Sequence, residues 1–157
     1  MKCILFLTAL LLPTAFTLNP SPCTFHSGPM PVEVRVIGCP PSVPQQPCIV
    51  PMGSTVDSEI DFVLQRPTST LTASLDIFLG DFRVPWSLPS DQQDACQDLM
   101  HGVSCPLSNV GERISYNLVT AVSAPFADVT VDMELMLTDD QGQAAFCYRS
   151  QATIVSA

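Results

Sequence analysis

The chain has 157 residues, with 15 acidic side chains against six basic ones and a formal net charge of −9 at pH 7. This acidity argues against nucleic acid and anionic membrane surfaces as partners, because both repel a negatively charged protein. The simplest interpretation of the charge is that it keeps the protein soluble.

The first residues are typical of a secretory signal peptide. Lys2 supplies a positive charge, residues 4–12 form a short apolar run, and Pro13 ends it. The run is too short for a membrane anchor, which needs about 20 apolar residues. We therefore expect a signal peptide over residues 1–17 and one mature domain over residues 18–157, which is long enough for a single substantial core.

Cleavage near Thr17 would remove Lys2, the only lysine, and leave five arginines against 15 acidic side chains, a formal net charge of −10. The expected destination is an oxidising compartment, either the extracellular space or a lumen such as that of the lysosome. Asn19 precedes proline, and Asn109 and Asn117 lack the hydroxyl residue of an N-glycosylation site. Glycan-dependent routing to lysosomes is therefore unsupported, which favours secretion.

Alternation of apolar and polar residues predicts β-strands along most of the mature chain. The alternating apolar positions are Val32, Val34 and Val36; Val56, Ile60, Phe62 and Leu64; Leu71, Ala73, Leu75, Ile77 and Leu79; Ile114, Tyr116, Leu118 and Val122; and Val129, Val131, Met133, Leu135 and Leu137. Residues 144–155 are expected to form the last strand. Prolines separate these segments, and proline disfavours both helices and central strands.

One short helix is predicted over residues 91–100, with Ser90 as its N-cap and Gln93 as the partner in a capping box. The sequence Asp-Asp-Gln-Gly at residues 139–142 predicts a tight turn and a hairpin between the last two strands. Short strands, many turns and little helix indicate an all-β fold in which two antiparallel sheets pack face to face.

Six of the seven cysteines lie beyond the expected leader, and an even number in an exported chain indicates disulfides. Cys39 and Cys48 enclose a proline-rich loop, and Cys96 and Cys105 also enclose eight residues. Bridging each of these pairs would leave Cys23 and Cys147 to join the first strand to the last. Six cysteines allow 15 pairings, so the spacing alone leaves the connectivity open.

Catalytic and metal-binding patterns are weak in this sequence. His26 and His101 are the only histidines, neither lies in a nucleophile motif, and we expect both in solvated loops. Asp91, Asp94 and Asp98 lack the arrangement of a calcium loop, and the cysteines lack neighbouring histidines at zinc spacing. We therefore expect no enzymatic activity, no cofactor and no metal site.

Several collinear motifs resemble the MD-2-related lipid-recognition (ML) family, and in particular its branch of Niemann-Pick type C2 proteins and mite group 2 allergens. The motifs are Cys23; Gly38-Cys39-Pro40; Gln46-Pro47-Cys48-Ile49-Val50 with Gly53; Val84-Pro85-Trp86-Ser87-Leu88-Pro89; Cys96; Cys105-Pro106-Leu107; and Asp139-Asp140-Gln141-Gly142 with Phe146-Cys147-Tyr148. The resemblance implies an immunoglobulin-like β-sandwich with an apolar cavity between its sheets. It also implies the disulfides Cys23–Cys147, Cys39–Cys48 and Cys96–Cys105.

The resemblance further implies a set of lipid-binding residues. Trp86 matches the aromatic of the Val-Pro-aromatic segment, and Val122 and Phe126 match the pair at the pocket mouth, although Pro125 here precedes the aromatic instead of following it. The deeper wall positions are Val36, Val56, Ile60, Phe62, Leu75, Val84, Val131, Met133, Leu135 and Tyr148. Judged from alternation alone, these wall residues fit an ordinary packed core better than a cavity, and Trp86 fits a plug over that core as well as a lid.

Two functions remain open at this point. The resemblance favours a monomeric, non-enzymatic carrier of a sterol, fatty acid or similar apolar ligand, with a membrane or a receptor protein as acceptor. The alternative is a protein-recognition module of innate immunity or chemical signalling that presents the loop between Cys39 and Cys48. The absence of lysine from the mature chain departs from the sterol-carrier branch, which approaches anionic lipids with basic surface.

Overall fold

The structure is a computed structural model, and it describes residues 16–17, 20–37, 39, 47–124 and 127–157. Nine strands make up most of it, together with two short 3-10 helices. The strands are β1 (Phe16–Thr17), β2 (Glu33–Ile37), β3 (Cys48–Pro51), β4 (Thr55–Val63), β5 (Leu71–Leu79), β6 (Phe82–Val84), β7 (Arg113–Ala121), β8 (Val129–Asp139) and β9 (Ala144–Val155), and the helices are η1 (Ser90–Gln92) and η2 (Ala95–Asp98). Within these residues no helix is long and apolar enough to cross a membrane.

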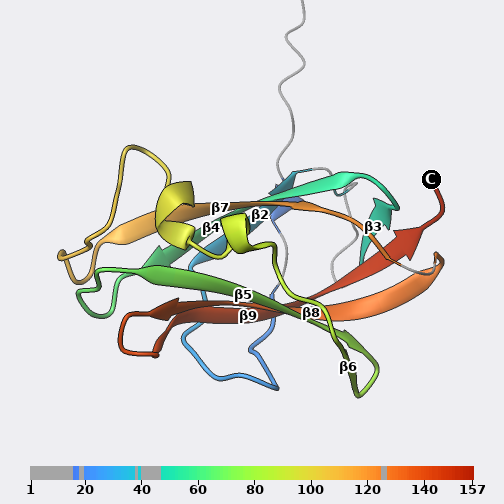
Figure 1. Ribbon diagram of the computed structural model, residues 1–157, viewed down its shortest axis with the longest axis horizontal. Helices are drawn as coiled ribbons and strands as arrows, with labels where there is room; N and C mark the ends of the chain where they lie inside the picture. Colours follow the sequence, from blue (N-terminus) through green and yellow to red (C-terminus); the bar gives the residue numbers. More distant parts are fainter. Residues whose placement is uncertain (1–15, 18–19, 38, 40–46, 125–126) are drawn as a thin grey trace, which may run out of the picture.

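The strands form two sheets that lie one over the other as two layers (Figure 1). The four-stranded sheet has the order β1-β2-β4-β7, and the five-stranded sheet has the order β3-β9-β8-β5-β6. All neighbouring strands are antiparallel except β3, which runs parallel to β9. The predicted β-sandwich is confirmed, with this one parallel pair as an exception to the expected antiparallel sheets.

The core occupies one end of the sandwich, where both sheets place large side chains on their inner faces. Phe62 of β4, Tyr116 of β7 and Phe146 of β9 are all fully buried there. The ring of Phe146 lies 5.4 Å from that of Phe62 and 6.5 Å from that of Tyr116, between centroids. Because the alternating residues point inward in turn, the sequence pattern identified these strands correctly.

Two predicted apolar positions lie at strand ends and are exposed. Val32 precedes β2 and is 53% exposed, and Leu79 ends β5 and is 47% exposed. Alternation shows which side chains of a strand point towards the core, but it does not show where the neighbouring elements stop covering that strand.

Two strands of the five-stranded sheet were missed by the sequence pattern. The strand β3 is only four residues long and ends in Pro51, which an edge strand tolerates because one side of its backbone lacks a partner. The strand β6 has three residues and forms a hairpin with β5, in which Gly80 has φ 59°. The short strand β1 lies within the expected leader, and the signal-peptide boundary stays a prediction.

The predicted helix over residues 91–100 is wrong, because this segment forms only η1 and η2. Pro89 occupies the N-cap of η1 without a side-chain hydrogen bond, so Ser90 does not cap it. The segment instead covers the edge of β5: the Gln93 carbonyl accepts a hydrogen bond from the Ala73 N–H at 2.8 Å, and Cys96 is bridged to Cys105. These contacts outweigh the local preference for helix.

The other local predictions hold. The turn between β8 and β9 is closed by the Asp139 N–H, which donates to the Gln143 carbonyl at 2.8 Å, and Gly142 has φ 73°. The three disulfides are Cys23–Cys147, Cys39–Cys48 and Cys96–Cys105, as the family resemblance implied.

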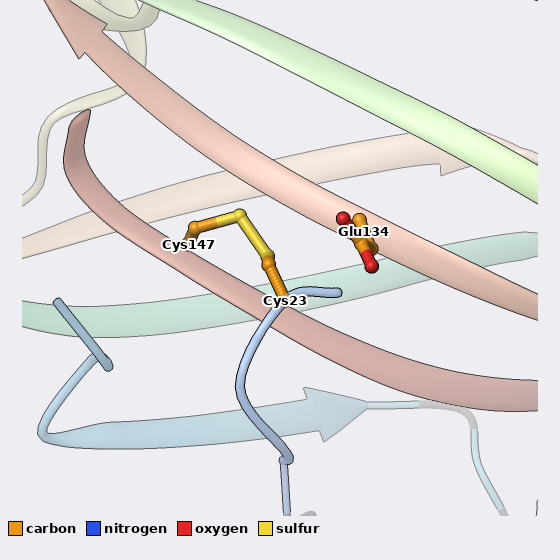
Figure 2. Close-up of side chains that lie close together, drawn as sticks. All are labelled: Cys23, Glu134 and Cys147. Atoms are coloured by element: carbon orange, nitrogen blue, oxygen red, sulfur yellow. A yellow bond between two sulfur atoms is a disulfide. The ribbon is translucent and has the colours of Figure 1, made fainter. Parts of the chain in front are cut away.

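An N-terminal segment, residues 20–31, is attached to the outer face of the five-stranded sheet, and we call it the strap. Figure 2 shows its Cys23–Cys147 bridge beside Glu134 of β8. The Glu134 carboxylate accepts hydrogen bonds from the backbone N–H groups of Thr24, Phe25 and His26, at distances from 2.7 to 3.2 Å. Burial alone would raise the pKa of Glu134, but these N–H groups and Arg149 lower it to about 2.

Candidate functional site

A cavity of about 120 Å³ lies between the two sheets, and its lining is mostly apolar. The four-stranded sheet contributes Val36, Val56, Ser58, Leu118, Thr120 and Ala121, and the segment after β7 adds Val122 and Ser123. The five-stranded sheet contributes Val50, Leu75, Ile77, Val131, Met133, Leu135, Tyr148, Ser150, Gln151, Ala152 and Ile154. Trp86 and the bridged Cys39 and Cys48 complete the lining.

The cavity and the packed core occupy opposite ends of the same strands. Along β4, Val56 and Ser58 line the cavity, whereas Ile60 and Phe62 are buried in the core. The strand β9 shows the same division, because Phe146 is in the core and the inward residues from Tyr148 to Ile154 face the cavity. The sandwich is therefore filled at one end and hollow at the other.

Nine of the residues expected at the ligand lie together in the cavity lining. They are Val36, Val56, Leu75, Trp86, Val122, Val131, Met133, Leu135 and Tyr148. They come from strands β2, β4, β5, β8 and β9 and from the segments after β6 and β7.

Three predicted wall positions lie outside the lining of this cavity. Ile60 and Phe62 belong to the filled end, where Phe146 occupies the space between the sheets. Val84 lies on the edge strand β6, where it pairs with Ile77 of β5, and it does not line the cavity. Phe126, with the preceding Pro125, lies outside the described residues.

Sequence reasoning missed the remaining lining residues for different reasons. Ile77 and Leu118 share the inward parity of predicted strands, and that signal could have identified them. Val50 belongs to β3, which the surrounding prolines concealed. Ser58 and Thr120 are polar, so a search for apolar alternation skips them although both lie on inner faces.

Polar groups at the cavity are few and uncharged. Ser58 is 8% exposed, and the Thr120 hydroxyl is buried with no hydrogen-bond partner among the described residues. Burial raises the pKa of Tyr148 well above its usual value, so its phenol stays neutral over the physiological range. Such a lining can surround an apolar molecule and offer it a few hydroxyl groups.

The group of Cys23, Glu134 and Cys147 has the composition of a metal site, and its ligand atoms lie within 4.8 Å of one another. Figure 2 shows, however, that the two cysteines form a disulfide, and a disulfide sulfur is not the thiolate that binds metals. The Glu134 carboxylate is already held by the strap. The group is therefore a structural attachment.

The histidines differ from each other in their surroundings. His101 is exposed, as expected. His26, expected in a solvated loop, lies on the strap with its Nε2 atom 2.5 Å from the buried Asp76 carboxylate. Both atoms are on the outer face of the five-stranded sheet, away from the cavity.

Comparison with known proteins agrees with the fold. The model of the ML domain matches residues 18–154. The chain is 27% identical over 119 residues to NPC intracellular cholesterol transporter 2 of Bos taurus, covering 74% of this chain and 72% of that protein. The crystal structure of a Niemann-Pick type C2 protein from the Japanese carpenter ant superposes with a TM-score of 0.64 at 20% identity, over 77% of this chain and 88% of that one. The chain belongs to the ML-domain family.

Proposed function

We propose that this protein is a secreted, non-enzymatic carrier that binds an apolar lipid between the sheets of its β-sandwich. The observation that carries the proposal is the cavity at the hollow end, which is lined by apolar residues of both sheets. Membership of the ML-domain family supports it, as does the similarity to a bovine protein named as a cholesterol transporter. Binding would be driven by removal of ligand surface from water, which contributes about 2.5 kcal/mol per 100 Å².

The cavity must widen to take a whole lipid. Its volume of about 120 Å³ is well below that of typical small-molecule sites, roughly 300–1,000 Å³, and is closer to the size that holds a benzene ring. Met133 has a flexible side chain, and Trp86 lies in the connection between β6 and η1, so both can move without breaking a strand. Ligand binding is thus expected to displace these two side chains first.

Transfer of the lipid would bring the hollow end to a membrane or to an acceptor protein, with the carrier acting as a monomer. The alternative function, recognition of a protein by the loop between Cys39 and Cys48, depends on residues 40–46, which lie outside the described residues. Protein recognition would be favoured if the experiment below finds no lipid binding.

The experiment starts from protein purified from its native secretions, from which bound lipid is extracted and identified by mass spectrometry. Trp86 is the only tryptophan and lines the cavity, so its fluorescence should shift when lipid is added to delipidated protein. Trp86→Phe is the matched control, because it keeps an aromatic ring but abolishes the signal. Absence of co-purified lipid, of displacement of a fluorescent sterol or fatty-acid probe, and of a tryptophan shift would reject the carrier and favour the recognition module.

A further inference from the structure

The strand β1 consists of two residues that the sequence pattern assigns to the leader. Phe16 pairs with Val36 of β2, and Thr17 pairs with Arg35, in antiparallel register. The same two residues of β2 pair with β4 on their other side, so β1 continues the four-stranded sheet. A leader that is removed together with these residues would take a strand away from the folded domain.

Other long strands near the margins of the two sheets are covered by neighbouring segments. Along β7 the Ser115 carbonyl accepts a hydrogen bond from the Met100 N–H at 2.9 Å, and along β9 the Ser21 carbonyl accepts one from the Arg149 N–H at 2.8 Å. In the five-stranded sheet the outermost strands are the short β3 and β6. Short outer strands leave few unpaired backbone groups at a sheet edge, which limits pairing with other chains.

The strand β1 has the same role beside β2. Within the part of the chain that the structure describes, it is the only strand that pairs with β2 on the side away from β4. Val36 also lines the cavity, so loss of β1 would leave an open edge in the cavity wall. An open edge exposes N–H and C=O groups to pairing with other chains. These contacts favour a mature chain that keeps Phe16 and Thr17.

A small residue lies directly before β1, as leader cleavage requires. Secretory leaders end in small residues after their apolar run, and Ala15 follows the run that Pro13 ends. Thr17, where the leader was expected to end, is larger than alanine and is paired within the sheet. A leader over residues 1–15 is also long enough, because leaders usually have about 15–30 residues.

We propose that the leader ends at Ala15 and that the mature protein begins at Phe16, with β1 as its first strand. A signal peptidase hydrolyses the peptide bond between these two residues: the hydroxyl of water goes to the Ala15 carbonyl carbon, and the remaining hydrogen goes to the Phe16 nitrogen. The net charge of the mature chain is the same for both boundaries, since residues 16–17 are uncharged. This inference does not depend on lipid binding.

The test expresses the full chain in a secretory cell line and identifies the first residue of the secreted protein by mass spectrometry. Phe16 is the expected first residue. Ala15→Leu should abolish chains that begin at Phe16, because a large residue replaces the small one at the cleaved bond. Thr17→Leu is the matched control and should leave cleavage unchanged, since Thr17 lies beyond that bond. If the leader instead ended at Thr17, this control variant would block processing.

Amide hydrogen exchange of the secreted protein tests the pairing itself. Hydrogen bonds alternate between the two sides of a strand, so one of the Arg35 and Val36 N–H groups faces β1 and the other faces β4. Both should be protected from exchange when β1 is in place. A first residue other than Phe16, a block of processing by Thr17→Leu, an Ala15→Leu variant that still begins at Phe16, or fast exchange of either amide would overturn the proposal.

Discussion

Replacing Glu134 by glutamine should destabilise the protein by an amount that depends on pH. The side chain is fully buried and accepts hydrogen bonds from three successive N–H groups of the strap, and its pKa is lowered from 4.5 to about 2. A difference of this size corresponds to about 3 kcal/mol of stability when the carboxylate is ionised. Glutamine keeps the volume but has neither the charge nor the second acceptor oxygen.

The sign of the pH dependence follows from the lowered pKa. The stabilisation by Glu134 is fully present above the unfolded-state pKa near 4.5, and it is lost as the pH falls towards 2. The difference between wild type and Glu134→Gln should therefore be about 3 kcal/mol at pH 7 and roughly half of that at pH 3.

Urea unfolding at pH 7, 5 and 3, with the disulfides intact, measures this difference. Asp140→Asn is the control: Asp140 is an exposed carboxylate on the turn, where its hydrogen bonds are made with the side chain and backbone of Ser69. We expect a smaller effect for the control. A Glu134→Gln loss that is equal at pH 7 and pH 3, or that is below that of the control, would refute the argument that the strap is held by an ionised carboxylate.

Three further outcomes are expected. Asp61→Asn should lower the free energy of unfolding by about 2 kcal/mol at pH 7 and by progressively less between pH 3.8 and 2. Burial alone would raise the pKa of Asp61, but Arg35 and Arg113 lower it to about 2. Urea unfolding across that pH range tests this, and a loss independent of pH contradicts it. Gly28→Ala should lower the free energy of unfolding by about 1–3 kcal/mol, since the added Cβ would lie 2.7 Å from the Ala144 Cβ. An unchanged melting temperature would argue against close packing of the strap on β9. Met133→Phe should reduce the affinity for a fluorescent sterol, because the larger side chain partly fills the cavity. Near-ultraviolet circular dichroism checks that the fold is intact. An unchanged affinity would argue that ligands bind elsewhere.

The strands with long alternating runs could be predicted because one face of each is buried along most of its length. The runs around Ile60, Tyr116 and Leu135 correspond to β4, β7 and β8. The segment after Pro89 was mispredicted as a helix because its structure is set by contacts with β5, which no local pattern contains. The same limit applies to β3, which exists only by pairing with β9.

The candidate site could be predicted in part. The residues with inward parity were identified, but parity does not tell which end of a strand is hollow. Ile60 and Ser58 lie two residues apart on the same face, yet one is in the core and the other lines the cavity. That boundary is set by the large rings of Phe146 and Tyr116 from other strands, so it appears only when the sheets are assembled.

The division of the sandwich into a filled end and a hollow end has a mechanical consequence. Aromatic packing around Phe146 joins the two sheets at the filled end, and at the hollow end the Cys39–Cys48 disulfide joins the segment after β2 to β3 of the other sheet. The two sheets are therefore held together at both ends, and sliding one sheet past the other would disrupt the core. The volume of the interior can then change through rearrangement of side chains such as Met133 and Trp86, while the register of every strand is preserved.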